Sequence, residues 1–100
     1  MLFEWDDRKN RANRIKHGID FDFARLAFDD PFAITTQDRD IDGQQRCQLL
    51  GAVFTRVILV AYASRVRSPT DFEEEPVIRI ISARKSTPAE RKLYEETAAN

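Results

Sequence analysis

Residues 77–83 alternate between the two sides of an extended chain, and both sides are mostly apolar. One side carries Val77, Arg79, Ile81 and Ala83, and the other carries Ile78, Ile80 and Ser82. A strand that is apolar on both faces is typical of the interior of a sheet rather than of its edge. The pattern therefore predicts an interior strand, around which the rest of the chain is organised.

The segment after this strand changes to a helical pattern. Thr87, Pro88 and Glu90 form a capping box, in which the threonine hydroxyl and the glutamate carboxylate each accept a backbone N–H of the other residue. We therefore predict a C-terminal helix that begins at Pro88. The N–H groups at its start, beside Arg84 and Lys85, predict a place for a phosphate.

The first part of the chain predicts a short strand and a helix. Residues 2–5 alternate, Asp6 is suited to be an N-cap, and Gly18 is the usual type of residue just beyond a helix C-terminus. The apolar residues of this helix are few, and we expect Ala12 and Ile15 to make its core contacts.

Further elements follow from Asp20 onward. Asp20 predicts the N-cap of a second short helix over residues 21–28. Strands are predicted at residues 32–37, 45–50 and 56–63, with a polar turn at 38–43, a bulge at Gly51, and a mobile excursion rich in proline and acid at 65–76.

The order of these elements predicts an α+β fold. It comprises two N-terminal helices, an antiparallel sheet of four or five strands whose neighbours are joined by turns, and a C-terminal helix. One hundred residues are enough for one small core, so we expect residues 1–100 to form a single domain.

Composition narrows the class of protein further. The hydrophobic fraction of 42% is ordinary for a soluble globular protein, and the longest apolar run, residues 57–63, is too short to span a membrane. Acidic residues near the start argue against a signal peptide, and the single cysteine, Cys47, excludes an internal disulfide. We therefore expect a cytoplasmic protein with no membrane partner.

Charge is segregated along the chain although the net charge is only −1. The balance is +2 over residues 1–19, −5 over 20–42, +4 over 43–70, −4 over 71–76, +4 over 77–92 and −2 over the tail. Such blocks can fold into one basic and one acidic face, or they can be the solvated surfaces of successive elements.

Most familiar functional motifs are absent from the sequence. Asp38, Asp40 and Asp42 have nearly the spacing of an EF-hand loop, but Leu49 stands where such a loop needs a glutamate, and strands are predicted on both sides. With one histidine and one cysteine, a zinc site of nitrogen and sulfur ligands is also disfavoured. We therefore predict no metal and no cofactor.

Two basic residues each allow two interpretations. Arg79 lies among apolar neighbours, where a charge is costly unless it is paired or lines a solvated cleft, so it is either a buried ion-pair partner or part of an anion site. His17 is either a C-terminal cap that the helix dipole stabilises or a group that transfers protons.

A larger set of residues, spread over nearly the whole chain, resembles the BrnT family. The set comprises Trp5-Asp6, Lys9, Asn13, Lys16-His17-Gly18, Phe21, Ala24, Phe28, Asp30-Pro31, Arg46, Gly51, Ile78 to Lys85, Glu90-Arg91 and Tyr94. This chain departs from the family pattern in a longer, more acidic segment at residues 65–76, which could cover the active face or repel RNA there, and in Ser86, where alanine is common.

The resemblance implies a RelE-like fold and a ribonuclease toxin of a BrnT/BrnA type II toxin–antitoxin pair, which cleaves RNA and blocks translation. It also implies a BrnA-like antitoxin with a ribbon-helix-helix part, a complex of two toxins and two antitoxins, and contact with operator DNA only through the antitoxin. The exposed edges of a small sheet also allow a homodimer.

Metal-independent RNA cleavage suggests roles for the matched residues. The 2′-hydroxyl attacks its own phosphate, so the enzyme must accept one proton, donate another and stabilise negative charge. We expect Arg79 and Arg84 to stabilise the charge and His17 to move protons. Tyr94 is a proton donor, a stacking platform or a core residue. The expected contacts to the RNA backbone are Lys9, Lys16, Arg46 and Lys85.

Three functions therefore stay open at this point. The first is a ribonuclease toxin, the second is a catalytically inactive toxin-like module that binds an antitoxin or regulator, and the third is a nucleic-acid-binding domain without catalysis. The third predicts an affinity that falls steeply with salt.

Overall fold

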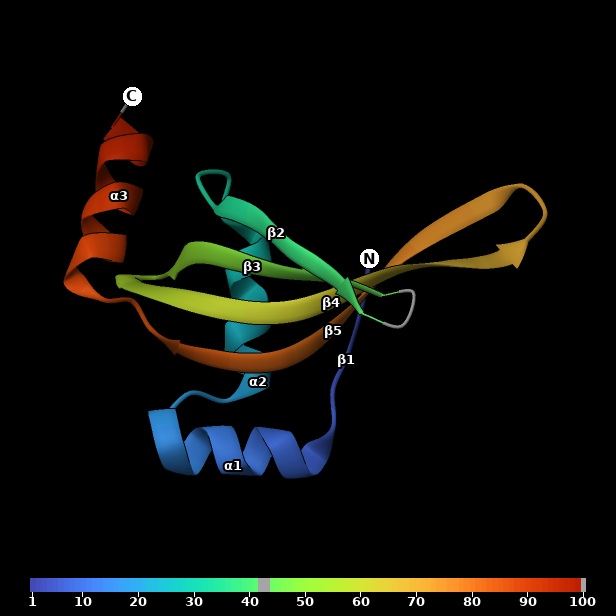
Figure 1. The fold of residues 1–100 in the computed structure, drawn as a ribbon, viewed down its shortest axis with the longest axis horizontal. Helices are drawn as coiled ribbons and strands as arrows, with labels where there is room; N and C mark the ends of the chain where they lie inside the picture. Colours follow the sequence, from blue (N-terminus) through green and yellow to red (C-terminus); the bar gives the residue numbers. More distant parts are fainter. Residues whose placement is uncertain (42–43, 100) are drawn as a thin grey trace.

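The computed structural model describes residues 1–41 and 44–99, which build one five-stranded sheet and its flanking helices (Figure 1). Asp42 and Gly43, the end of the predicted polar turn, lie outside the described residues. The strands are β1 (Leu2–Glu4), β2 (Ile34–Ile41), β3 (Gln44–Val53), β4 (Arg56–Thr70) and β5 (Glu73–Lys85). The helices are α1 (Asp7–His17), α2 (Phe21–Ala24), the 3-10 helix η1 (Arg25–Asp29) and α3 (Pro88–Ala99).

The predicted α+β class is confirmed, but the sheet is mixed. Its strand order is β1-β5-β4-β3-β2, and β2 to β5 form a continuous antiparallel meander. The short β1 instead pairs in parallel with β5. A parallel pair needs a long connection, and the helices and strands between β1 and β5 provide it. The predicted antiparallel sheet, with neighbouring strands joined by turns, did not include such a pair. β5 lies between β1 and β4 only over residues 77–79, so the predicted interior strand is confirmed for that part; farther along, β5 is the edge of the sheet.

One face of the sheet is covered by α2 and η1, which lie behind the strands in Figure 1. We call it the helix-covered face. Its core is made of side chains with almost no exposed surface, among them Phe21, Ile58, Val60 and Ile80. Partly buried aromatic side chains pack against this core, and Phe28 meets both Phe3 and Tyr62 edge-on.

The opposite face of the sheet is covered at one end only. Helix α3 lies at that end (Figure 1), and its Tyr94 packs on Leu50, Val57 and Leu59. We call the remainder the open face, which the strand register assigns to Arg46, Gln48, Ala61, Ala63, Arg79 and Ser82. The open face is therefore a sheet surface bordered by α3 at one end and by α1 along the β5 side.

Three of the predicted loops or irregularities have a different structure. Residues 65–76 extend β4 and β5 into a projecting two-stranded ribbon rather than an irregular excursion, and Phe72 at its tip is 97% exposed (Figure 1). Strand β2 continues through most of the predicted polar turn, to Ile41. Gly51 is not a bulge, because its pairing with Ile58 is regular; a side chain there would press against the Ala27 carbonyl, 3.1 Å from the added Cβ.

The irregular positions in the sheet are elsewhere. In β5 the register shifts so that Ile81 has no counterpart on β4, and in β2 a similar shift leaves Asp38 without a counterpart on β3. Each shift is a β-bulge, which reverses the alternation of the side chains that follow it. This explains why Ala83 lies in the core of the helix-covered face with Ile78 and Ile80, and not on the side of Val77 as simple alternation predicted.

Candidate functional site

Helix α1 begins and ends where its sequence predicted. The Asp6 carboxylate accepts the backbone N–H groups of Arg8 and Lys9, at 2.8 and 3.2 Å. These bonds lower the pKa of Asp6, since they favour the charged carboxylate. At the other end, Gly18 has a φ of 71°, a left-handed conformation that glycine adopts without strain.

The contacts that hold α1 are polar, contrary to prediction. Ile15, expected in the core, is 82% exposed, whereas Asn13 is buried. The Asn13 side-chain amide donates to the carbonyls of Ile19 and Ala83, both at 2.9 Å, and its oxygen accepts the Ala83 N–H at 3.1 Å. β1 pairs only with residues 77–79 of β5, so Asn13 takes the place of a neighbouring strand farther along. It therefore fixes α1 against the sheet edge.

Three basic or titratable side chains are positioned by this contact. Lys9, Lys16 and His17 lie within one helical turn or so of Asn13, on the helix side that faces β5. With Ile81 and Ser82 they line a cavity of about 310 Å³ between α1 and the open face. Among the residues that the structure describes, none of the three side chains forms an ion pair. The cavity therefore carries positive charge that is available to an anion.

Two arginines extend this positive surface across the open face. Arg46 of β3 and Arg79 of β5 are both register partners of Ala63 on β4, so they flank the same buried alanine. Both are half-buried, and the Nε of Arg46 is buried without a hydrogen-bond partner among the described residues. Two positive side chains on either side of one alanine can both contact an anion that lies over it. The acidic register partner of Arg79 on β1 is Glu4, whose carboxylate is ion-paired with Arg65 at 3.3 Å.

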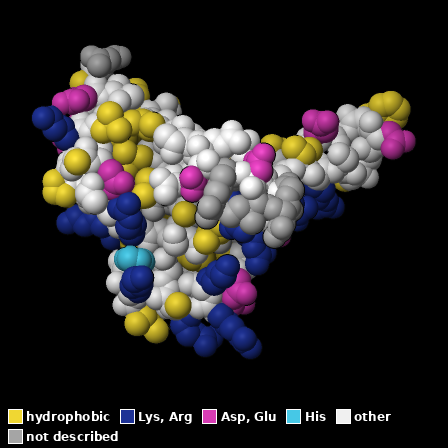
Figure 2. All heavy atoms as spheres, viewed as in Figure 1, with side chains coloured by type: hydrophobic (Ala, Val, Ile, Leu, Met, Phe, Trp, Pro, Cys, Tyr) yellow, Lys and Arg dark blue, Asp and Glu magenta, His cyan; other side chains and the backbone are white. Residues whose placement is uncertain are grey.

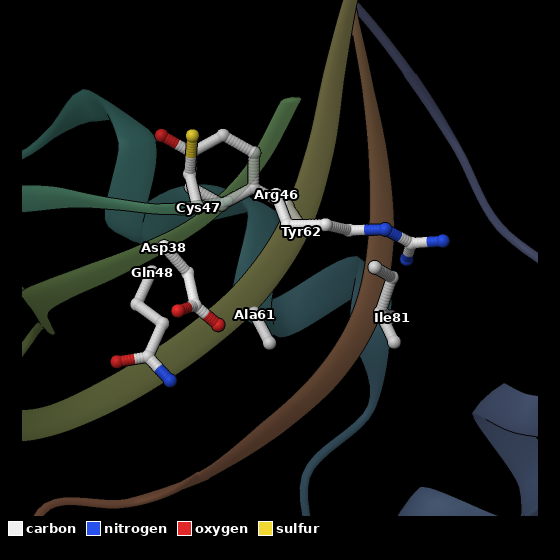
Figure 3. A pocket seen from close by; sticks show the side chains of 7 residues that line it. All are labelled: Asp38, Arg46, Cys47, Gln48, Ala61, Tyr62 and Ile81. Carbon is white, nitrogen blue, oxygen red and sulfur yellow. The ribbon is translucent and has the colours of Figure 1, made fainter. Parts of the chain in front are cut away.

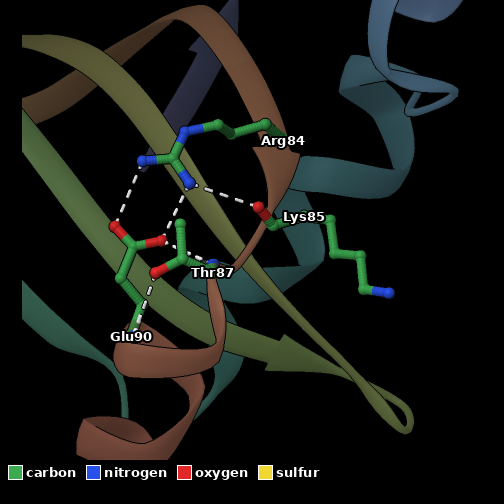
Figure 4. Close-up of polar contacts among 4 residues, drawn as sticks. All are labelled: Arg84, Lys85, Thr87 and Glu90. Atoms are coloured by element: carbon green, nitrogen blue, oxygen red, sulfur yellow. Dashed lines mark hydrogen bonds and ion pairs between the residues drawn. The ribbon is translucent and has the colours of Figure 1, made fainter.

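Arg84, a predicted charge stabiliser, is engaged by a carboxylate. Its guanidinium forms a two-pronged ion pair with Glu90, at 2.8 and 3.1 Å, and also donates to the carbonyl of Lys85 (Figure 4). The hydrogen bond from Arg84, followed by that from the Thr87 backbone, lowers the pKa of Glu90 to about 2. Glu90 also raises the pKa of Arg84.

The start of α3 is likewise occupied. The predicted capping box is confirmed, with Thr87 N–H donating to Glu90 at 2.8 Å and Glu90 N–H donating to Thr87 Oγ1 at 3.1 Å (Figure 4). The carboxylate of Glu90 therefore sits where the sequence suggested a phosphate, which argues against an anion site at this helix start.

Lys85 and Tyr94 also lie apart from the α1 cavity. Lys85 lines a different cavity with Thr55, Arg56 and Arg91, between the start of β4 and α3. The Tyr94 hydroxyl donates to Asp30, and burial, followed by this hydrogen bond, raises its pKa to about 12. A phenol with so high a pKa holds its proton tightly, and its ring is part of the core beneath α3.

The structure thus brings together five of the eight predicted site residues. They are Lys9, Lys16, His17, Arg46 and Arg79. Figure 2 shows the single histidine bordered by Lys and Arg side chains on this side of the molecule. Arg84, Lys85 and Tyr94 have other partners. Sequence reasoning did not identify the anchoring role of Asn13, whose only signal was an amide placed between basic residues on one helix face.

Two negative findings apply to the described part of the chain. Residues 1–41 and 44–99 contain no group of three or more histidine, cysteine, aspartate or glutamate side chains placed to hold a metal ion. They also include no helix long and apolar enough to cross a membrane.

The chain matches the model of one known protein family. The model of one protein family, described as "Ribonuclease toxin, BrnT, of type II toxin-antitoxin system", matches residues 5–90. The match includes α1, the open face, β5 and the Arg84–Glu90 pair. A comparison with curated proteins finds no match.

Proposed function

We propose a reaction and a site for this chain, which belongs to the BrnT family of ribonuclease toxins of type II toxin–antitoxin systems. The chain acts as a single toxin domain that cleaves RNA without a metal ion and thereby inhibits translation. The observation that carries the proposal is the α1 cavity, where Lys9, Lys16 and His17 face the open side of β5 without ion-pair partners in the described structure.

The proposed reaction is an internal transfer of the phosphoryl group. His17 accepts the proton of the 2′-hydroxyl, the 2′-oxygen bonds to phosphorus, and the bond from phosphorus to the 5′-oxygen breaks. Lys16 donates a proton to the departing 5′-oxygen. The products are a 2′,3′-cyclic phosphate and a free 5′-hydroxyl, so no water and no metal-bound hydroxide are required.

Arg79 and Arg46 have the second task, which is to stabilise charge. The phosphate gains negative charge as the fifth oxygen approaches, and a planar guanidinium matches two of its oxygens at once. Lys9 holds the RNA backbone beside them. The half-buried position of both arginines supports this role, because partial exclusion of water strengthens their attraction for an anion.

We assign supporting roles to the remaining candidates. Arg84, paired with Glu90, holds the turn between β5 and α3, and Tyr94 ties α3 to Asp30 beneath it. Lys85 lies with Arg56 in the more distant cavity and contacts RNA only beyond the cleavage site.

The direct test is cleavage by the purified protein in excess chelator. A labelled single-stranded RNA should yield a 2′,3′-cyclic phosphate and a 5′-hydroxyl, and Arg79→Ala should abolish cleavage while its thermal unfolding stays close to that of wild type. Arg67→Ala, which removes an arginine from the projecting ribbon, is the matched control. An unfolded Arg79→Ala protein would show that Arg79 is structural, and cleavage that stops on chelation would refute the metal-independent reaction.

We also propose that the partner is a BrnA-like antitoxin with a ribbon-helix-helix part, in a complex of two toxins and two antitoxins. Operator DNA is then contacted through the antitoxin alone. Co-expression with the product of the neighbouring gene, followed by sedimentation analysis, tests this stoichiometry. A complex that forms although wild-type protein neither cleaves RNA nor arrests growth would instead support the inactive binding module.

A further inference from the structure

A second cavity lies on the open face and adjoins the α1 cavity. It has a volume of about 170 Å³, and its polar lining comes from Asp38, Arg46 and Gln48 (Figure 3). Ile81 lines both cavities, so the two meet at this residue. A chain that crosses the open face can therefore occupy both at once.

Two of the three register shifts of the sheet lie at this cavity, and the third lies in the projecting ribbon, between Arg67 and Thr70. Asp38 is the extra residue of β2 and Ile81 is the extra residue of β5, and both line it. A bulge costs ladder hydrogen bonds and re-aims the side chain it carries, and bulges are common next to functional sites. Their coincidence at one cavity indicates that its lining is a built feature and not a chance gap between side chains.

The lining combines hydrogen-bonding groups with an apolar surface. Figure 3 shows the Asp38 carboxylate and the Gln48 amide side by side, with the Arg46 guanidinium reaching over Ile81 on the other side. Ala61 and Ile81 supply apolar surface between them. The Nε of Arg46 is buried and has no partner among the described residues, so this side chain has unused capacity to donate a hydrogen bond.

We propose that this cavity binds an unstacked guanine of the RNA, next to the phosphate that is cleaved. Guanine is the only one of the four bases whose Watson–Crick edge presents two adjacent donors, N1–H and the N2 amino group, and a carboxylate such as Asp38 accepts both. The Gln48 amide donates to the neighbouring O6. Sequence-specific proteins read unpaired RNA bases through these edges.

Arg46 links the base to the reaction. Its guanidinium lies between the cavity and the α1 side of the open face, where it meets the phosphate that follows the bound base. The positive charge of Arg46 also reduces the repulsion between the Asp38 carboxylate and the phosphates of the RNA backbone. This inference rests on the proposed ribonuclease function, which it deepens by naming the base recognised.

Binding of free nucleotides tests the cavity without requiring catalysis. The probes are the four nucleoside 3′-monophosphates, titrated by calorimetry into wild type, into Asp38→Asn and into the matched control Asp40→Asn, an exposed site on the same strand that lines neither cavity. We expect the guanosine nucleotide to bind about tenfold more tightly than the others. Asp38→Asn should remove this preference and Asp40→Asn should keep it. Equal affinity for all four, or a preference that survives in Asp38→Asn, overturns the proposal.

Mapping of cleavage sites then separates the two proposals. Sequencing of the 5′-hydroxyl ends from a random RNA pool should show guanine enriched at one position beside the cut, with the enrichment lost in Asp38→Asn and kept in Asp40→Asn. Cleavage with no base preference overturns the guanine cavity and leaves the ribonuclease intact. If wild type cuts no RNA but binds the guanosine nucleotide through Asp38, the reaction is refuted and the cavity stands.

Discussion

Helices α1 and α3 border the same sheet, and basic residues of the predicted site lie on α1 and just before α3, but their ion pairing differs. Near α3, Arg84 is paired with Glu90 and Arg91 with Glu95. Near α1, Lys9, Lys16 and His17 form no ion pair among the described residues and face a cavity instead. A basic stretch is therefore a candidate anion site only where the fold leaves its charges unpaired.

The two helices are also held in different ways. α3 packs the ring of Tyr94 on apolar residues of the sheet, whereas α1 is attached by the amide of the buried Asn13. An anchor made of hydrogen bonds needs only one residue in the centre of the helix face. The positions one turn to either side are therefore free to carry the lysines and the histidine, which an apolar interface would have excluded.

Among changes on the two helices, the largest effect should follow from the loss of the proton-transferring group. His17→Ala is expected to lower the rate of RNA cleavage by about 10²- to 10⁴-fold, the usual contribution of general acid–base catalysis. Arg11→Ala, on the same helix but outside the cavity, should stay within about twofold of wild type. A His17→Ala protein that keeps more than a tenth of the activity would place the proton transfer elsewhere.

The anchor itself should give the next largest effect. Asn13→Ala leaves the N–H and carbonyl of Ala83 and the carbonyl of Ile19 without their partner, so we expect a loss of about 3 kcal/mol in the free energy of unfolding. Ile15→Ala should change it by no more than about 0.5 kcal/mol, because that side chain is exposed. Urea denaturation of the two variants measures the contrast, and a larger loss for Ile15→Ala would reverse it.

The local signals of the sequence were accurate where one short segment determines the structure. Asp6 and Gly18 define the ends of α1, and Thr87 with Glu90 defines the start of α3, because each cap is formed by neighbouring residues. The alternation of β5 identified a strand for the same reason, although β1 flanks only its residues 77–79.

Non-local features could not be read in this way. The partner of Asn13 is Ala83, seventy positions away, and a helical amide gives no sign of which backbone group it will meet. The bulges at Asp38 and Ile81 depend on how the neighbouring strands pair. Similarly, the sequence grouped Arg84 with Arg79, since only the folded turn reveals that Glu90 pairs with Arg84.

A smaller effect is expected for the pair at α3. Glu90→Gln should lower stability at pH 7 by about 1 kcal/mol, since both partners keep part of their surface in water. The folded-state pKa of Glu90 is about 2, below its ordinary 4.5, so this stabilisation is present above pH 4.5 and is lost as the pH falls toward 2.

Thermal unfolding across pH measures this prediction. The melting temperatures of wild type and Glu90→Gln should differ by about 4–8 °C at pH 7 and converge near pH 2. RNA cleavage by the variant should stay within about threefold of wild type. A difference in melting temperature that persists at pH 2 would show that the charge of Glu90 is not its source.

The smallest effect should come from Tyr94→Phe. This change removes the hydroxyl that donates to Asp30 and keeps the ring in the core, so we expect a loss of about 0.5–1.5 kcal/mol in stability and an unchanged rate of cleavage. Single-turnover kinetics on a labelled RNA provide the readout. A tenfold slower cleavage step would show that Tyr94 touches the substrate.

The central claim, that the unpaired charges at α1 do the chemistry and those near α3 do not, is tested most directly by two double variants of equal charge. Lys9→Ala/Lys16→Ala removes two lysines from the α1 cavity, and Lys85→Ala/Lys92→Ala removes two from the neighbourhood of α3. In single-turnover cleavage at saturating protein, we predict at least a hundredfold loss for the first and at most threefold for the second. Equal losses, or a greater loss for the second, would contradict the account.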